Sequence, residues 1–263
     1  MASIAFLGAG NIAQAIMGGL SGDNHELYAY DPVPACREAA AAIGAMITEN
    51  NKEAIEKADV VILCVKPNVV PDLVAEEAAS LREKMTISVA AGITTETMLS
   101  AIGSGAAVVR CMPNTPALVK TGMTALFATS GVSEPQKDLA QTILSAVGET
   151  LWVSDETALD AVTAVSGSGP AYFFLMMEAM IAAAEAEGLD TDTARQLVLQ
   201  TALGAATMAH SSEDAPSQLR INVTSPGGTT QAALETFESL GLPDMVRKAV
   251  NAARVRSEEL SQS

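Results

Sequence analysis

Basic residues are scarce in this chain of 263 residues. Fifteen Lys and Arg residues stand against 31 Asp and Glu residues, which gives a formal net charge of −16. A field of this sign repels phosphate backbones, so we expect no nucleic-acid partner. An anionic small molecule would therefore need a binding site whose positive potential is built locally.

Aromatic residues and cysteines are also few. Aromatics make up 3 % of a chain that is 49 % hydrophobic, so the predicted core consists mainly of aliphatic side chains. The three cysteines, Cys36, Cys64 and Cys111, are odd in number and show no CxxC spacing. This pattern is typical of reduced thiols and predicts neither a disulfide framework nor a metal site.

A hydrophobic run long enough to cross a membrane is missing. The most apolar segment, residues 171–184, is interrupted by Glu178 and is shorter than the ~20 residues that a bilayer requires. The first seven residues lead directly into a predicted strand and a glycine loop, so we expect no leader peptide. The sequence therefore predicts a cytoplasmic protein without membrane contact.

Strand-like and helix-like segments alternate in the first part of the chain. This alternation predicts an α/β fold, a Rossmann-type doubly wound parallel sheet in residues 1–153 that binds a dinucleotide. The expected strands are Ser3–Leu7, Glu26–Tyr30, Ala45–Thr48, Val60–Val65, Thr86–Ala90 and Ala107–Cys111, with a helix at Pro34–Ile43.

The pattern becomes helical after Trp152. We expect an all-helical substrate-binding and dimerisation domain in residues 154–263. Its predicted helices are Asp155–Val165, Pro170–Glu187, Asp192–His210 and Thr229–Leu240. The second of these helices is apolar almost all round, which is usual for a buried helix. Because about 110 residues can hardly bury it alone, we expect a second subunit to cover it.

The first glycine loop has the features of a dinucleotide site. Gly8-Ala9-Gly10-Asn11-Ile12-Ala13 follows a strand and opens a helix, and Asp31 lies 31 − 10 = 21 positions after Gly10. Asp31 either binds the adenine ribose, which favours NAD over NADP, or caps the turn at Pro32. Arg37 is expected in the following helix.

Two further turns end strands at the edge where such sheets bind ligands. Lys66-Pro67 could meet a phosphate or ribose, or Lys66 could be a solvated charge. Ala90-Ala91-Gly92 leaves room for a flat nicotinamide ring. Arg110 either contacts a ligand or forms a structural ion pair.

A second glycine loop, Ser225-Pro226-Gly227-Gly228-Thr229-Thr230, suits a small carboxylate. Its backbone N–H groups lead into a helix and two hydroxyls stand beside them. The same hydroxyls could instead cap that helix. The segment Ser166–Pro170 favours a plain break between two helices. The two glycine loops together predict hydride chemistry on a small anion.

With these motifs in order, together with Val65-Lys66-Pro67, Arg110–Pro116 and Ser166–Tyr172, the chain resembles the pyrroline-5-carboxylate reductase family over essentially its whole length. The resemblance implies reduction of the cyclic imine 1-pyrroline-5-carboxylate to L-proline by NADPH or NADH, the last step of proline biosynthesis. It also implies a homodimer through the helical domain, possibly gathered into a decamer. Members of this family commonly prefer NADPH. Asp31 is a departure that counts against this preference here, because a carboxylate repels the 2′-phosphate of NADPH.

The resemblance assigns site residues to this chain. Thr230 is the catalytic residue, placed near the ring nitrogen. The implied substrate-binding residues are Ser225, Gly228, Thr229, Thr230 and, more loosely, Glu156 and Glu213. The implied cofactor-binding residues are Gly8, Ala9, Gly10, Asn11, Ile12, Ala13, Asn51, Val65, Lys66, Pro67, Ala90, Ala91, Gly92 and Asn222, to which the spacing from the glycine loop adds Asp31.

Two other functions are open to such a sequence. A β-hydroxyacid dehydrogenase would use a helical-domain Lys as acid and base, but no Lys lies between Glu156 and Arg247. A nucleotide-sensing or scaffold protein would bind NAD(P)H without turnover and would not need the 225–230 loop.

Reduction of a C=N bond requires neither a metal nor a covalent nucleophile. It requires only orientation of the substrate and one proton.

Overall fold

The computed structural model describes residues 1–261 and divides the chain into two compact units. One unit contains Met1–Ser168 together with the chain from Ala253 onward, and the other contains Gly169–Ala252. The domain boundary expected between residues 153 and 154 stays a prediction.

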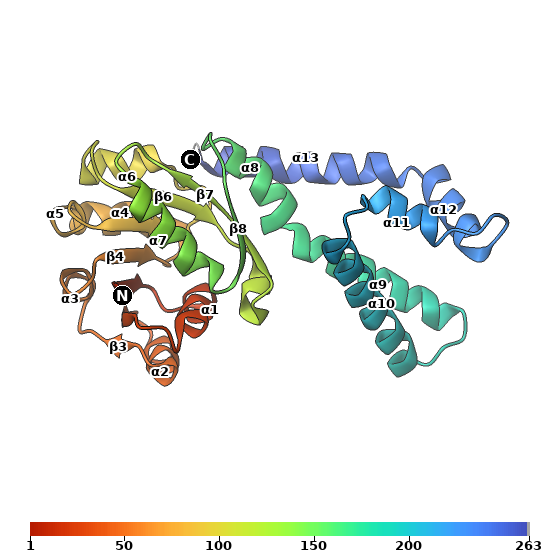
Figure 1. Ribbon diagram of the computed structural model, residues 1–263, viewed down its shortest axis with the longest axis horizontal. Coiled ribbons are helices and arrows are strands. Elements are labelled where there is room, and N and C mark those ends of the chain that lie inside the picture. Colours follow the sequence, from red (N-terminus) through yellow and green to blue (C-terminus); the bar gives the residue numbers. More distant parts are fainter. Residues whose placement is uncertain (262–263) are drawn as a thin grey trace. The chain divides into compact units, whose positions relative to one another are not determined.

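The first unit is built on an eight-stranded sheet within the described residues, in the order β3-β2-β1-β4-β5-β6-β7-β8 (Figure 1). The predicted α/β class and Rossmann-type sheet are confirmed, and each expected strand ends within two residues of the observed one. The strands are β1 (Ser3–Leu7), β2 (Glu26–Tyr30), β3 (Met46–Ile47), β4 (Val60–Leu63), β5 (Met85–Ser88), β6 (Val108–Met112), β7 (Gly122–Ala128) and β8 (Gly148–Trp152).

The last two strands go beyond the sequence analysis. β7 runs antiparallel to β6 and parallel to β8, so the sheet is parallel only from β3 to β6. In β8 exposed and half-buried side chains alternate, which gives it a much weaker apolar signal than the fully buried β4. The six predicted strands are parallel as expected, and β7 adds an antiparallel pairing that the sequence analysis did not predict.

Alternating side chains of the central strands feed two separate cores. Ile4 and Phe6 of β1 pack with Ile16 in one cluster. Ala5 and Leu7 of the same strand pack with Met98 in the other. Successive side chains of a strand point to opposite faces, so β1 is apolar from Ile4 to Leu7 because helices cover both faces.

The helices of the first unit cover both faces of the sheet and connect its strands (Figure 1). They are α1 (Asn11–Leu20), α2 (Pro34–Ile43), α3 (Asn51–Glu56), α4 (Val70–Glu76), α5 (Ala78–Leu81), α6 (Thr95–Ile102), α7 (Glu134–Ser145) and α8 (Ala158–Val162). Short 3-10 turns occupy Pro67–Val69 and Thr115–Val119.

The chain remains helical between α8 and the second unit. A π-helical turn at Thr163–Gly167 follows α8, and α9 begins at Gly169. The expected helix Asp155–Val165 therefore begins three residues later, at Ala158. The expected break within Ser166–Pro170 is confined to Ser168, because the π-helical turn continues through Gly167 and α9 begins at Gly169, with Pro170 in its first turn.

The second unit is helical, and no strand occurs in its described residues. It contains α9 (Gly169–Ala186), α10 (Thr191–Ser211), α11 (Pro216–Asn222), α12 (Thr229–Ser239) and most of α13 (Leu242–Ser261). α9 and α10 pack against each other. No helix among residues 1–261 is both long and apolar enough to cross a membrane.

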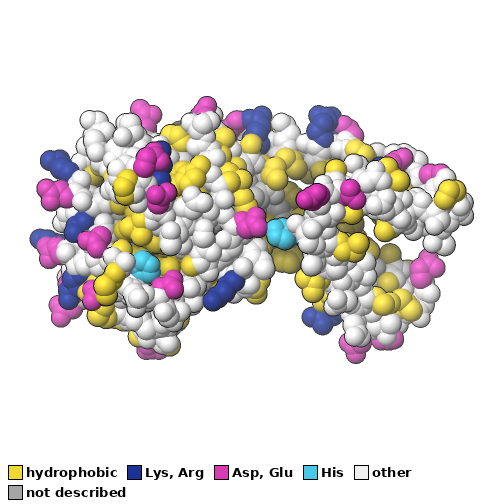
Figure 2. Space-filling model, viewed as in Figure 1, with side chains coloured by type: hydrophobic (Ala, Val, Ile, Leu, Met, Phe, Trp, Pro, Cys, Tyr) yellow, Lys and Arg dark blue, Asp and Glu magenta, His cyan; other side chains and the backbone are white. Residues whose placement is uncertain are grey.

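Helices α9 and α10 expose many large apolar side chains. Phe173 is 69 % exposed and Leu175 is 66 % exposed. Figure 2 shows hydrophobic side chains at the surface of this helical unit. Many large exposed apolar side chains on a pair of helices are typical of a surface that contacts another protein, which agrees with the expected second subunit.

A glycine contact between β7 and β8 gives a test of the sheet edge. Gly148 has a φ of +146°, and a Cβ there would lie 2.0 Å from the Gly122 carbonyl oxygen. We expect Gly148→Ala to lower the free energy of unfolding by about 3 kcal/mol or more, from overpacking and backbone strain. Gly105→Ala, where the Cβ would point into open space, is the control, and we expect less than about 1 kcal/mol there. Equal denaturation midpoints for the two variants would contradict the observed pairing.

Candidate functional site

The two outer glycines of the first loop serve different purposes. Gly8 has a φ of +92°, and a Cβ there would lie 2.8 Å from the backbone of Cys64. The fold itself therefore requires Gly8. Gly10 has an ordinary φ of −74°, and no described atom would lie within 4 Å of its Cβ. The open space beside Gly10 fits the close approach of a pyrophosphate.

The N-terminus of α1 is open as well. Its N-cap is Gly10, and no described side chain caps it. By contrast, α3, α6 and α10 are capped by the side chains of Asn50, Thr94 and Asp190. The first N–H groups of α1 lack a side-chain acceptor, so the helix end can bind an anion.

Asp31 ties the glycine loop to the end of β2. Its Oδ2 accepts the Ala9 N–H at 2.8 Å, and its Oδ1 accepts the Val33 N–H at 2.8 Å. The side chain thus caps the turn, one of the two roles expected for it. Arg37 lies in α2 as expected, and its Nη1 donates to the Asp31 carbonyl at 2.6 Å. Binding of a ribose by Asp31 stays a prediction.

The other predicted cofactor residues of the first unit follow neighbouring parallel strands or begin a helix. Val65, Lys66 and Pro67 begin two residues after the end of β4, and Ala90–Gly92 begins two residues after the end of β5. Because β1, β2, β4 and β5 are parallel, these turns and the first glycine loop lie at the same edge of the sheet. Asn51 is the first residue of α3.

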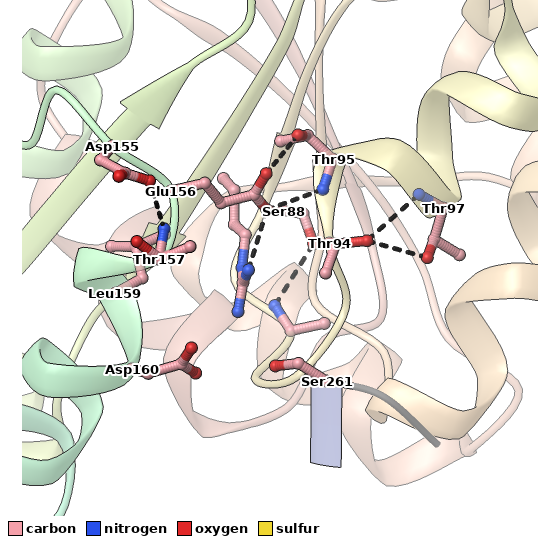
Figure 3. Close-up of polar contacts among 12 residues, drawn as sticks. Ser88, Thr94, Thr95, Thr97, Asp155, Glu156, Thr157, Leu159, Asp160 and Ser261 are labelled. Atoms are coloured by element: carbon pink, nitrogen blue, oxygen red, sulfur yellow. Dashed lines mark hydrogen bonds and ion pairs between the residues drawn. The ribbon is translucent and has the colours of Figure 1, made fainter. Parts of the chain in front are cut away.

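Glu156 is held by three donors of the first unit (Figure 3). Its Oε1 accepts the Thr95 N–H at 2.8 Å and Arg110 Nη1 at 2.8 Å. Its Oε2 accepts the Thr95 hydroxyl at 2.5 Å. Arg110 is thus in the structural ion pair that was one of its two expected roles. A contact between Glu156 and substrate stays a prediction, and its carboxylate is already occupied.

The second glycine loop presents a bare helix N-terminus. Gly228 is the N-cap of α12, and its N–H donates to the Ser225 carbonyl at 3.0 Å. No side chain in the described part of the chain caps this helix, so the alternative of hydroxyl capping is wrong. Thr229 and Thr230 are instead the first two helical residues.

Both glycines of this loop are needed for its shape. Gly227 has a φ of +70°, and its N–H donates to Gln231 Oε1 at 2.7 Å. A Cβ on Gly228 would lie 3.0 Å from the Ser225 carbonyl oxygen. The two residues that lead into α12 therefore have no side chain, and only their backbone atoms lie beside the start of the helix. Free amides at a helix end and adjacent hydroxyls can bind a carboxylate.

The remaining predicted residues of the second unit lie outside this turn. Asn222 ends α11, and its Oδ1 accepts Gln218 Nε2 at 2.8 Å. Glu213 is exposed between α10 and α11. Their assigned roles in binding cofactor and substrate stay predictions.

Sequence reasoning missed a contact made by the end of α13. Ser257 Oγ donates to Asp160 Oδ1 at 2.6 Å. The Leu260 carbonyl lies against Gly92, where a Cβ would come within 3.2 Å of it. The end of α13 therefore supports the turn after β5. No periodic or motif signal near residue 257 points to this long-range contact.

No cluster of His, Cys, Asp or Glu among residues 1–261 could hold a metal ion. Burial raises the pKa of the Cys64 thiol to about 12 and raises the pKa of Cys111 as well. Both groups are therefore neutral thiols near pH 7, since a thiol loses its proton only as pH rises through its pKa.

Thiol labelling tests this burial. At pH 8 we expect iodoacetamide to modify at most Cys36 rapidly in the native protein, because the thiolate is the reactive form. All three cysteines should react after unfolding in guanidinium. Mass spectrometry of the native protein would contradict the account if it found rapid modification of Cys64 or Cys111.

Replacing Gly10 tests the nucleotide site. Gly10→Ala meets no protein atom but fills the space beside α1, so we expect an unchanged circular dichroism spectrum and at least about tenfold weaker NADPH binding. Gly18→Ala, in the same helix and also in open space, should bind NADPH normally. Equal affinities of the two variants, measured by calorimetry, would remove Gly10 from the site.

Two known protein families match separate parts of this chain. Residues 156–260 match the pyrroline-5-carboxylate reductase dimerisation family. Residues 3–92 match the family described as NADP oxidoreductase coenzyme F420-dependent. The first match includes the loop at Ser225–Thr230, and the second includes the first glycine loop and Ala90–Gly92.

Individual proteins are similar along the whole chain. Pyrroline-5-carboxylate reductases from Pseudomonas aeruginosa and Haemophilus influenzae are 48 % and 45 % identical, and each alignment covers 98 % of this chain and 97 % of the relative. The structure of the Coxiella burnetii pyrroline-5-carboxylate reductase is 41 % identical with a TM-score of 0.94, covering 100 % of this chain and 99 % of that one. The NADP-bound Plasmodium falciparum pyrroline carboxylate reductase is 28 % identical with a TM-score of 0.87, covering 99 % and 98 %. The chain belongs to the pyrroline-5-carboxylate reductase family.

Proposed function

We propose that this protein reduces 1-pyrroline-5-carboxylate to L-proline with NADPH or NADH. The observation that carries the proposal is the bare N-terminus of α12, where Gly228 leaves the first amides of the helix without a side-chain cap. Curated relatives up to 48 % identical over the whole chain carry this activity in their names. The substrate has one carboxylate, which fits such a helix end.

We assign the cofactor to the edge of the sheet formed by the first glycine loop and the turns after β4 and β5. Gly8–Ala13, Asp31, Asn51, Val65–Pro67 and Ala90–Gly92 would hold it, and Asn222 of the second unit is a further proposed contact. Bound NADPH or NADH would supply a hydride. The open space at Gly10 supports this assignment.

The substrate residues have separable roles. Amides at the start of α12, with Ser225 and Thr229, would bind the carboxylate, and the Thr230 hydroxyl would orient the ring nitrogen. The C=N carbon gains the hydride, the nitrogen gains one proton, and the C=N double bond becomes a single bond. A hydroxyl is a poor proton donor at neutral pH, so the proton comes with an iminium substrate or through water.

Glu213 is the acidic group proposed to favour the cationic nitrogen. It is exposed, whereas the Glu156 carboxylate already accepts three hydrogen bonds within the first unit. An exposed carboxylate attracts a cation only weakly across water, so we expect Glu213 to contribute less than Thr230.

The match to a dimerisation family supports an oligomer. We propose a homodimer through the helical unit, supported by the exposed apolar side chains of α9 and α10. These exposed side chains include Phe173, Phe174, Leu175, Leu197 and Leu203. A decamer and a cytoplasmic location stay predictions.

An isotope experiment tests the reaction. The assay uses NADPH that carries deuterium at C4 of the nicotinamide ring. We expect one deuterium at C5 of the proline formed, without exchange with water. The deuterium should be transferred from only one face of the nicotinamide ring. Nuclear magnetic resonance of the product gives this result directly. Binding of NADPH without its oxidation in the presence of 1-pyrroline-5-carboxylate would favour the nucleotide-sensing alternative and contradict the proposal.

Thr230 can be tested by substitution. Thr230→Ala should lower kcat by about 10- to 100-fold without abolishing it, the usual range for one positioning or acid–base group. Thr230→Ser should restore much of the rate because it keeps the hydroxyl. Thr236→Ala is the matched control, since Thr236 lies in the same helix and its hydroxyl bonds only the Ala232 carbonyl at 2.9 Å. A Thr230→Ala rate equal to that of the control would remove Thr230 from the mechanism.

A further inference from the structure

The cluster around Glu156 joins three parts of the first unit. Glu156 lies just before α8, Arg110 lies in β6, and Thr95 is the first residue of α6. Figure 3 shows the Glu156 carboxylate directed at the start of α6. One carboxylate thus fixes the relative positions of a strand, a helix start and the segment leading into α8.

The carboxylate lies where α6 most favours a negative charge. Thr95 supplies both its backbone N–H and its hydroxyl to Glu156. The Thr94 side chain separately accepts the Thr97 N–H at 3.3 Å and caps the same helix. Carboxylates at helix N-termini are stabilised by the free N–H groups and by the helix dipole.

Arg110 makes this arrangement hard to replace. Its side chain is only 6 % exposed, and Glu156 is its ion-pair partner at 2.8 Å. A buried cation that loses its partner is strongly unfavourable. With three donors bound, the Glu156 carboxylate has little capacity left to pair with an incoming cation.

The segment that Glu156 anchors is the turn after β5. Residues 89–94 connect β5 to Thr95, and the 90–94 part of this connection includes the proposed cofactor residues Ala90, Ala91 and Gly92. Ser88 Oγ accepts the Ala90 N–H at 3.4 Å at one end, and Glu156 holds Thr95 at the other. The Leu260 carbonyl oxygen lies next to Gly92, on the side where a Cβ of that residue would point.

We propose that Glu156 is a positioning residue for the cofactor, which acts by anchoring the 90–94 turn through Thr95, and that it does not bind the substrate. This inference rests on the proposed function, because it takes the Ala90–Gly92 turn as a cofactor contact. Loss of the anchor lets the turn shift, and small misplacements at such a site weaken binding and turnover together.

Thr95→Val provides the clean test. Valine has nearly the shape of threonine, keeps the Thr95 N–H bond and leaves the Arg110–Glu156 pair intact, but removes the hydroxyl bond to Oε2. We expect the Kd for NADPH, measured by calorimetry without substrate, to rise roughly three- to thirtyfold. The KM for 1-pyrroline-5-carboxylate at saturating NADPH should stay within about twofold of the unaltered protein. Thr95→Ser should restore the NADPH affinity.

The matched control is Ser133→Ala. Ser133 caps α7 with Gln136, and its removal weakens another helix N-terminus of the same unit. This variant should lose comparable thermal stability yet keep the Kd for NADPH. The comparison separates anchoring of the 90–94 turn from general destabilisation of the unit.

Glu156→Gln distinguishes the two roles of the carboxylate. We expect a raised Kd for NADPH together with a lowered Tm, because Arg110 loses its charged partner. A raised KM for 1-pyrroline-5-carboxylate with an unchanged Kd for NADPH would assign Glu156 to the substrate and overturn the inference. An unchanged Kd in Thr95→Val would overturn it equally. Because the Kd for NADPH is measured without turnover, the Thr95→Val result remains readable even if the protein does not reduce this imine.

Discussion

The proposed ligand sites depend on two helix N-termini whose first backbone N–H groups are not capped by a side chain. In a chain with a net charge of −16, anions can be bound only where positive potential is built locally. Gly10 and Gly228 are the N-caps of α1 and α12, and neither helix end has a described side-chain cap. Other helices of the same chain are capped by Asn50, Thr94 and Asp190. A glycine cap leaves the first amides of a helix open to a ligand, at a small cost in local helix stability relative to a side-chain cap.

The sheet places the turns of the first unit, and a small number of polar contacts fix their shape. Asp31 accepts the Ala9 N–H of the first glycine loop and the Val33 N–H just after β2. Glu156 bonds the start of α6 while neutralising Arg110. Each carboxylate is thus used to hold backbone in place. An acidic protein can therefore keep these carboxylates near a site for anionic ligands, because backbone amides and a guanidinium hydrogen-bond to them and offset their negative charge.

The first six strands and both glycine loops could be predicted from the sequence, because their signals are local. Val60–Leu63 is a continuous apolar run, and Gly8 and Gly227 need a positive φ. β8 was missed because only alternate residues are half-buried. The Glu156–Thr95 bond joins residues 61 positions apart, and the Ser257–Asp160 bond joins residues 97 positions apart. The family resemblance assigned Glu156 loosely to the substrate, but only the fold shows what its carboxylate contacts.

The most direct measurement is a crystal structure of the protein with NADP⁺ and L-proline bound. The account predicts the pyrophosphate on the amides at the start of α1 beside Gly10, and the proline carboxylate on the amides at the start of α12 beside Gly228. A proline carboxylate bound by side chains elsewhere, with the α12 amides left to water, would contradict it.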